Sequence, residues 1–219
     1  MEVVLNVFLL CFSGIAWTIV YIKLIKSGFK EKTYGIPLFA LSLNLAWEAI
    51  YSYADVILKV HGSGLLVTIQ GYINIIWFIL DIIILITFLK FGRKYFINKL
   101  SNRQFYLFSI ITIFTSFAIQ IAFILEFDFY SAVAYSAFLQ NLLMSIAFIY
   151  FFYSRKTLEG QSLLIAISKW LGTLAPTILF GFLRGNIFVI IIGLLCSIFD
   201  IIYILLIINS KKTHQLKIV

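Results

Sequence analysis

Long, uninterrupted apolar runs recur along this sequence and constrain its fold more than any other feature. A helix that crosses the hydrocarbon core of a bilayer needs about 20 predominantly apolar residues. Of the 219 residues, 63% are hydrophobic and only 12% are charged, whereas soluble domains average about 25% charged residues. The runs are continuous and do not alternate, which excludes a transmembrane β-barrel. The sequence therefore predicts an all-α, multi-pass integral membrane protein with one transmembrane domain over residues 1–219.

Seven of these runs are long enough to span a bilayer, and the spans with their short loops account for the whole chain. The expected transmembrane helices cover residues 3–21, 36–58, 65–89, 104–125, 131–153, 163–183 and 187–209. Pro176 lies inside the sixth of them and predicts a kink there.

The basic residues predict how the helices are oriented. All 17 Lys and Arg residues except Lys59 and Arg184 fall in the first, third and fifth loops, just inside the sixth span (Lys169), or in the C-terminal tail. Basic residues are enriched in cytoplasmic loops. We therefore expect the N-terminus outside and the C-terminus in the cytoplasm. Because the basic residues sit between apolar runs rather than on one face, the net charge of +8 does not indicate nucleic-acid binding.

Two similar segments suggest an internal repeat. Residues 78–86 and 197–205 each place an aspartate, Asp81 or Asp200, within an isoleucine-rich stretch. In a 3+1+3 arrangement both would belong to third helices that run in the same direction, as a parallel repeat requires.

Three acids lie well inside the predicted spans, where each charge costs at least about 2.5–3.5 kcal/mol. Counting along the helices places Glu48 and Asp200 near the membrane midplane and Asp81 closer to the cytoplasmic side. No Lys or Arg is expected to reach the two central acids. Burial without a counter-charge favours the neutral, protonated acid, so Glu48 and Asp200 could be a proton donor and its partner.

Polar neighbours share helix faces with these acids. Spacings of three and four residues place side chains on one face of a helix, and such stripes indicate a polar cavity between helices. Hydrogen bonding between helices is the alternative explanation for the amides. The stripes are Asn44, Glu48, Tyr51 and Asp55; Gln70, Asn74, Trp77 and Asp81; Ser116 and Gln120; Ser136, Gln140 and Met144; and Cys196, Asp200 and Tyr203.

Aromatic residues accompany the acids. Trp47 and Tyr51 lie beside Glu48, Trp77 lies one turn before Asp81, and Tyr203 lies about one turn after Asp200. Aromatic faces stabilise desolvated cations by about 2 kcal/mol or more. A cavity with a proton donor and aromatic walls suits carbocation chemistry, while space filling is the alternative role of each ring.

Several familiar motifs are absent from the sequence. There is no DDxxD cluster for magnesium-assisted ionisation of a diphosphate and no DxDD acid motif. No lysine lies within residues 187–209 to form a retinal Schiff base, and no His and Cys cluster has metal-site spacing. We expect neither a cofactor nor a metal.

Three segments together resemble the membrane-integral terpene cyclases best known from fungal meroterpenoid and indole-diterpene pathways. They are Ser-Leu-Asn-Leu-Ala-Trp-Glu (42–48), Trp-Phe-Ile-Leu-Asp (77–81) and Phe-Asp-Ile-Ile-Tyr (199–203). The resemblance extends over the whole chain in length, helix number and motif order.

The resemblance implies a proton-initiated cyclisation of a lipophilic prenyl or meroterpenoid substrate, often one with a terminal epoxide. It implies catalytic roles for Glu48, Asp200 and Asp81, with Glu48 as the general acid. The candidate substrate-binding residues are Asn44, Trp47, Tyr51, Asn74, Trp77, Tyr203 and Gln140. The partners would be the prenylated small molecule and the lipid bilayer, with the oligomeric state left open. A small transporter that uses the three acids as a proton or solute pathway is the alternative.

Overall fold

The computed structural model describes residues 2–60, 62–96, 100–155 and 157–216, excluding the side chains of residues 2 and 212–216. Within these ranges the chain forms helices and no strands. The α-helices are α1 (Glu2–Lys30), α2 (Leu38–Val56), α3 (Leu65–Phe91), α4 (Asn102–Glu126), α5 (Phe129–Ser154), α6 (Leu163–Pro176) and α7 (Ile187–Leu216). A short 3₁₀ helix (Gly92–Tyr95) follows α3, and a π-helix, η2 (Thr177–Phe182), follows α6.

Six of the seven helices are long and apolar enough to cross a membrane, with α6 counted together with η2. This finding supports a multi-pass membrane protein. The helix that falls outside the six is α2, which carries the polar stripe with Asn44, Glu48 and Asp55. Because α2 packs against α3, α4 and α5, most of its surface faces protein and tolerates polar residues that lipid would not.

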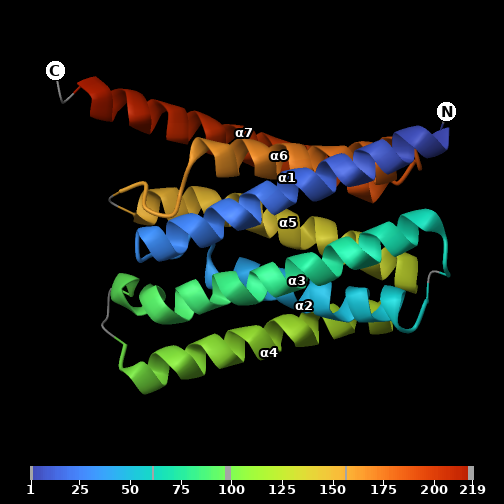
Figure 1. Ribbon diagram of the computed structural model, residues 1–219, viewed down its shortest axis with the longest axis horizontal. Coiled ribbons are helices and arrows are strands. Elements are labelled where there is room, and N and C mark those ends of the chain that lie inside the picture. Colours follow the sequence, from blue (N-terminus) through green and yellow to red (C-terminus); the bar gives the residue numbers. More distant parts are fainter. Residues whose placement is uncertain (1, 61, 97–99, 156, 217–219) are drawn as a thin grey trace.

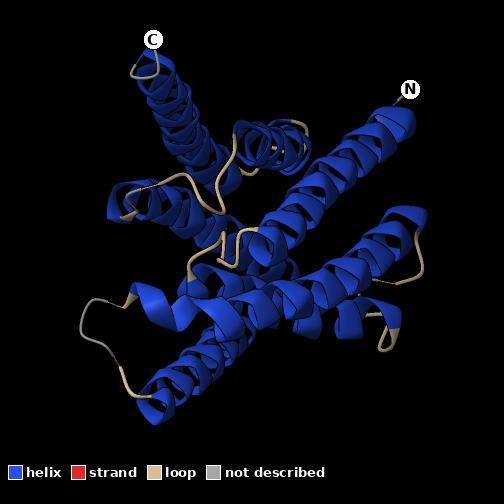
Figure 2. Ribbon diagram, turned by 60° about the vertical axis from the view of Figure 1, so that its left-hand side comes forward, coloured by secondary structure: helices blue, strands red, loops and turns tan. Residues whose placement is uncertain are grey.

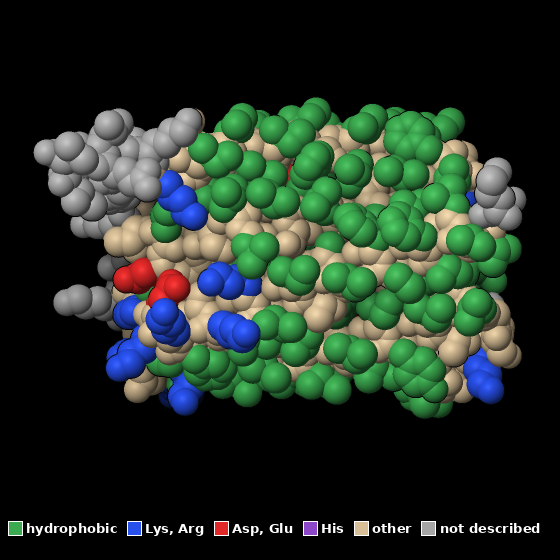
Figure 3. All heavy atoms as spheres, turned by 45° about the horizontal axis from the view of Figure 1, so that its top comes forward, with side chains coloured by type: hydrophobic (Ala, Val, Ile, Leu, Met, Phe, Trp, Pro, Cys, Tyr) green, Lys and Arg blue, Asp and Glu red, His purple; other side chains and the backbone are tan. Residues whose placement is uncertain are grey.

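The helices run alternately in opposite directions, so the two termini lie at opposite ends of the bundle (Figure 1). Figure 2 shows that the helix axes are tilted relative to one another. In Figure 3 most of the visible Lys and Arg side chains gather at one end, and hydrophobic side chains cover the middle of that face. The orientation of this bundle in a membrane stays a prediction; Lys99, Lys156 and Lys217 of the basic set lie outside the described residues.

The first and last helices are longer than the apolar runs predict. Helix α1 continues to Lys30 and α7 to Leu216, so Lys23, Lys26 and Lys30 lie on α1 and not in a loop. A helix can continue beyond the apolar run because lysine is a good helix former.

Side-chain capping defines the starts of three helices. Ser101 and Gln104 form a capping box at α4, and the side chains of Asp128 and Ser162 accept hydrogen bonds from Ser131 and Ile165 at the starts of α5 and α6. The hydrogen bonds from Ser131 lower the pKa of the Asp128 carboxyl.

The predicted irregularity at Pro176 coincides with a change in helix type. Proline has no N–H, and its ring crowds the preceding turn. The α-helical pattern ends at Pro176, and the wider π-helix of η2 continues the chain.

The contacts between helices follow the same pattern in the two halves of the bundle. Helices α1 and α2 each pack on α3, and α5 and α6 likewise each pack on α7. The halves meet through α1 against α6 and α2 against α5, while α4 packs on α2 and α5. A 3+1+3 repeat requires this pattern, and the repeat itself stays a prediction.

Candidate active site

A cavity of about 390 Å³ lies between the two halves of the bundle. Its walls come from α1, α2, α3, α5, η2 and the connection between η2 and α7. Cavities of about 300–1,000 Å³ bind small molecules and cofactors. The lining is mostly apolar, with polar residues at a few points; the polar and charged members are Ser13, Asn44, Glu48, Asp55, Gln70, Ser131, Gln140, Asn141, Arg184 and Asn186.

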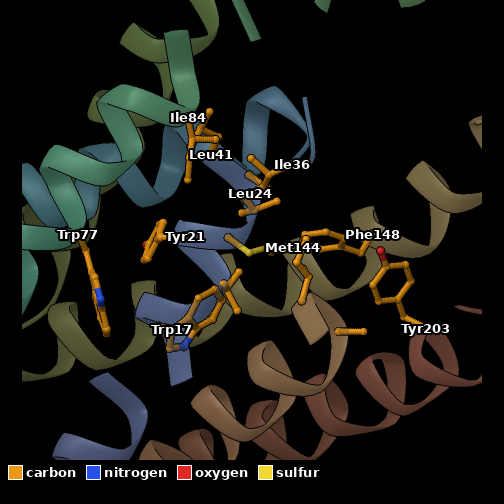
Figure 4. Packing of buried hydrophobic residues seen from close by; sticks show 14 of the residues in the cluster. Trp17, Tyr21, Leu24, Ile36, Leu41, Trp77, Ile84, Met144, Phe148 and Tyr203 are labelled. Atoms are coloured by element: carbon orange, nitrogen blue, oxygen red, sulfur yellow. The ribbon is translucent and has the colours of Figure 1, made fainter. Parts of the chain in front are cut away.

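Aromatic side chains form much of the wall around Glu48. The Trp17 and Tyr21 ring centroids are 6.2 Å apart, and those of Tyr21 and Trp77 are 5.9 Å apart. Figure 4 shows these three side chains grouped together. Hydrogen bonds fix two indoles: Trp77 Nε1 donates to Thr18 Oγ1 at 3.1 Å, and Trp47 Nε1 donates to the Val133 carbonyl at 3.1 Å.

Glu48 is held by donors from two helices. The Tyr21 hydroxyl on α1 donates to Glu48 Oε1 at 2.6 Å, and Asn44 Nδ2 on α2 donates to the same oxygen at 2.8 Å. The two N–H groups of Asn44 Nδ2 also lie within hydrogen-bonding reach of Tyr21 Oη and, at 3.0 Å, of Asp81 Oδ2 on α3, so one of them is shared between acceptors. One amide therefore connects the carboxyl groups of Glu48 and Asp81.

Two glutamines orient that amide. Gln140 Nε2 on α5 donates to Asn44 Oδ1 at 3.2 Å, and Gln120 Nε2 on α4 donates to Gln140 Oε1 at 2.8 Å. The acceptor role of Asn44 Oδ1 leaves the nitrogen facing the carboxyl groups. The chain of hydrogen bonds thus fixes the donor side of Asn44 toward Glu48 and Asp81.

The second oxygen of each carboxyl group, Glu48 Oε2 and Asp81 Oδ1, is buried and accepts no hydrogen bond from another polar group, and the two residues are only 1% and 0% exposed. The two carboxyl groups are close enough to hydrogen-bond to each other when one of them is protonated. Glu48 lines the cavity, whereas Asp81 lies behind it. Of the two connected acids, Glu48 is therefore the one that a molecule in the cavity can touch.

Asp200 belongs to a different cluster. Lys169 Nζ on α6 lies 2.7 Å from Asp200 Oδ1 on α7 and donates to Ser145 Oγ on α5 at 2.7 Å. The expectation that no basic residue pairs with Asp200 is wrong, because Lys169 points into the protein and is fully buried. Among the described residues, no hydrogen bond joins Asp200 to Glu48, so the structure does not connect the two acids expected near the midplane.

The comparison with known families is decisive. Residues 2–213 match the model of the Pyr4-like transmembrane terpene cyclases. The chain belongs to this family. No solved structure matches it.

The curated relatives of this chain are fungal proteins. It is 28% identical over 205 residues to terpene cyclase pyr4 of Aspergillus fumigatus, covering 87% of this chain and 80% of the relative. It is 26% identical over 171 residues to the Pyr4-family terpene cyclase mfmH of Annulohypoxylon moriforme, covering 77% of this chain and 66% of the relative. Terpene cyclase macJ of Penicillium terrestre is 37% identical over 78 residues, 36% of this chain and 27% of the relative. The matched regions thus span about two thirds or less of mfmH and macJ.

The structure divides the predicted substrate-binding residues into two groups. Asn44, Trp47, Trp77 and Gln140 line the cavity. The remaining three, Tyr51, Asn74 and Tyr203, are buried and are not among its described lining residues.

Each of these three has other neighbours. Tyr51 packs against Trp47 with ring centroids 5.1 Å apart, and Asn74 accepts a hydrogen bond from Gln70. Tyr203 donates to Gln161 and packs on Phe148, away from Trp77 and Tyr21 in Figure 4.

Three residues of the aromatic and polar clusters were not among the predicted site residues. Trp17 and Tyr21 lie four residues apart on α1 and line the cavity, so their spacing was a signal for a shared aromatic face. Lys169 was grouped with the basic residues at the membrane edge, and nothing in the sequence shows that it points toward α7. In the part of the chain that is described, no group of three His, Cys, Asp or Glu residues is arranged to hold a metal ion.

Proposed function

We propose that this protein cyclises a lipophilic prenyl substrate in the cavity between its helices, by protonating a terminal epoxide or alkene with Glu48 as the general acid. The observation that carries the proposal is the unequal environment of the two Glu48 oxygens. Family membership supports a terpene cyclase over the transporter alternative.

The hydrogen bonds indicate which Glu48 oxygen would hold the proton. Oε1 accepts hydrogen bonds from Tyr21 and Asn44, so its lone pairs are engaged. Oε2 accepts no hydrogen bond and is the natural position for the acid proton. Because Glu48 lines the cavity, this proton can be transferred to a substrate atom.

Asp81 would stay protonated when Glu48 transfers its proton to the substrate. Glu48 and Asp81 share the Asn44 donor and have no Lys or Arg among their hydrogen-bonding partners in the described chain. Two buried carboxyl groups that share a site without a cation do not both ionise. When Glu48 gives up its proton, the Tyr21 and Asn44 donors stabilise the carboxylate that forms.

The proposed reaction is an isomerisation that consumes no co-reactant. The proton from Glu48 goes to the epoxide oxygen, one C–O bond breaks, and the oxygen becomes a hydroxyl group. The resulting carbocation takes up the electrons of a neighbouring double bond, which forms the ring bond. The final cation loses a proton, which returns to the Glu48 carboxylate directly or through water, so that a carbon–carbon double bond forms and the protein regains its starting protonation state.

The aromatic wall would stabilise the intermediate cations. Trp17, Tyr21, Trp47 and Trp77 all line the cavity. A desolvated cation over an aromatic face gains about 2 kcal/mol or more. The rings therefore offer stabilisation to a cation that forms beside Glu48.

Asp200 would act as a positioning residue, through the ion pair with Lys169. It is not among the described residues that line the cavity. Lys169 Nζ lies 5.9 Å from the centroid of Trp17, a wall residue. The pair thus fixes α6 and α7 behind the aromatic wall.

The proposal is tested with membranes that contain wild-type protein or the Glu48→Gln variant. The probes are a farnesylated dihydroxybenzoate methyl ester with a terminal epoxide and its alkene counterpart, with cyclised products measured by mass spectrometry. General acid catalysis contributes about 10²–10⁴-fold, so Glu48→Gln should lower turnover by at least that range. Glu126→Gln is the matched control because Glu126 is exposed at the end of α4. Wild-type turnover in Glu48→Gln would contradict the assignment of Glu48.

A further inference from the structure

Arg184 occupies a position that the distribution of basic residues does not explain. It lies in the connection between η2 and α7, at the end of the bundle opposite the basic loops. Among the described residues that line the cavity, it is the only Lys or Arg. Lys59 is the other basic residue predicted for this end, and it is not among the described lining residues.

A neighbouring ring holds the Arg184 side chain at the cavity wall. The guanidinium carbon lies 4.8 Å from the centroid of Phe180, which also lines the cavity. The Arg184 side chain is exposed, and a guanidinium beside a ring can still donate hydrogen bonds from its N–H groups. Arg184 is thus an oriented cation at the cavity wall.

The cavity is elongated along the helices and polar at both ends. On α1 its lining runs from Leu9 to Tyr21, about 18 Å of helix. On α2 it includes Glu48 and, about 10 Å nearer the α2–α3 end, Asp55. Arg184 lies at the same end as Asp55, because the α6–α7 and α2–α3 connections share one end of the bundle (Figure 1).

We propose that Arg184 recognises the head group of the substrate of this enzyme. It binds the carboxylate or carbonyl oxygen of an aromatic head group at the end of the cavity lined by Arg184 and Asp55, here called the mouth. The prenyl terminus then extends inward to Glu48. This inference rests on the proposed function and adds the direction in which the substrate lies.

The residues at the mouth fit such a head group chemically. A guanidinium binds a carboxylate through two parallel hydrogen bonds, and the Phe180 ring offers a face for an aromatic ring. The lining also contains apolar residues such as Leu9, Leu66 and Leu179, which match a hydrocarbon chain.

Binding is measured in the Glu48→Gln background, so that no turnover interferes. The probes are an epoxyfarnesyl dihydroxybenzoic acid, its methyl ester, and the epoxyfarnesyl chain without a ring. Quenching of tryptophan fluorescence reports binding, since Trp17, Trp47 and Trp77 line the cavity. Each probe is titrated, in non-ionic detergent, into the Glu48→Gln protein, which is the parent. The same titrations are made with three double variants that combine Glu48→Gln with Arg184→Gln, Arg184→Lys or Lys59→Gln.

Arg184→Gln should weaken binding of the acid by about 10- to 100-fold, the range of a charge-assisted hydrogen bond. Arg184→Lys should recover part of the loss for the acid, and the chain without a ring should bind within about twofold of the parent. Equal weakening of all three probes by Arg184→Gln would overturn the proposal. So would an equal effect of Lys59→Gln on the acid, because that result would indicate general electrostatic attraction.

Turnover by wild-type protein separates this inference from the proposed function. If no probe is cyclised but Arg184→Gln selectively weakens the acid, the head-group assignment stands and the proposed chemistry fails. If the probes are cyclised and Arg184→Gln changes neither the binding nor the KM of the acid, the proposed chemistry stands and the head-group assignment fails.

Discussion

The Tyr21 hydroxyl donates a 2.6 Å hydrogen bond to Oε1 of Glu48, and this contact joins α1 to α2 inside the bundle. Tyr21 is 2% exposed and Glu48 is 1% exposed, so water does not compete for the contact. The bond engages one carboxyl oxygen and leaves the other unpaired. The asymmetry of Glu48 therefore depends on a residue from another helix.

Tyr21→Phe should reduce turnover while keeping the shape of the cavity. A hydrogen bond to a charged group contributes about 1.5–3 kcal/mol, so loss of the donor to the Glu48 carboxylate predicts a roughly 10- to 100-fold lower kcat. The measurement is product formation at saturating substrate. Tyr72→Phe is the control, because Tyr72 is on α3 and 57% exposed; similar rates in the two variants would contradict the role of Tyr21.

Lys169→Met should destabilise the protein strongly. It leaves the Asp200 carboxylate buried without its partner, which typically costs about 3–5 kcal/mol. The measurement is the apparent Tm in detergent, followed by the double variant Lys169→Met/Asp200→Leu. Recovery of much of the stability and activity in the double variant is expected if Asp200 is a positioning residue. A stable double variant with no activity would instead assign Asp200 a direct part in the chemistry.

Trp77→Leu should slow the reaction and change the products. Trp77 lines the cavity beside Tyr21, and loss of about 2 kcal/mol of cation stabilisation predicts a roughly 30-fold lower rate. Incompletely cyclised products should increase, since a less stabilised cation loses its proton earlier. Trp77→Phe keeps an aromatic face and should restore part of the rate; equal rates for the Leu and Phe variants would rule out a role for the π face.

Gly172→Ala should narrow the cavity from behind its wall. A Cβ at Gly172 on α6 would lie 2.7 Å from Trp17 Cδ1, so Trp17 would have to move. Overpacking of this kind costs about 1–3 kcal/mol, and we expect both a lower Tm and a higher KM. Gly14→Ala is the matched control, since its added methyl group meets only the movable end of Ile73, at 3.0 Å. Equal KM changes in the two variants would show that Trp17 does not transmit the effect.

Much of the fold could be predicted because it depends on local properties of the chain. The seven apolar runs coincide with the seven helices of the described chain to within a few residues when η2 is counted with α6, except where α1 and α7 continue beyond the apolar region. The polar stripes also face inward: Asn74, Trp77 and Asp81 are buried on α3, and Ser116 and Gln120 are buried on α4. A helical period of 3.6 residues determines which side chains share a face, so the sequence reports it directly.

The partners of these faces could not be predicted in the same way. Asn44 and Lys169 both lie six residues after the first residue of their helices. Asn44 donates to Asp81 on α3, and Lys169 donates to Asp200 on α7. One donor is neutral and connects Asp81 to Glu48, while the other is charged and forms an ion pair with Asp200. The sequence shows the two aspartates in similar segments, but not which side chain reaches each of them.

The sequence by itself determined that this protein is a multi-helix membrane protein with a few acids and amides facing its interior, because hydrophobicity and helical periodicity are properties of single segments. Only the tertiary structure decided that Glu48 is joined to Asp81 and Tyr21 at a cavity, whereas Asp200 is neutralised by Lys169 away from it. Those pairings depend on how each helix is rotated and which helix lies beside it. Packing among all seven helices sets both, and no single segment contains that information.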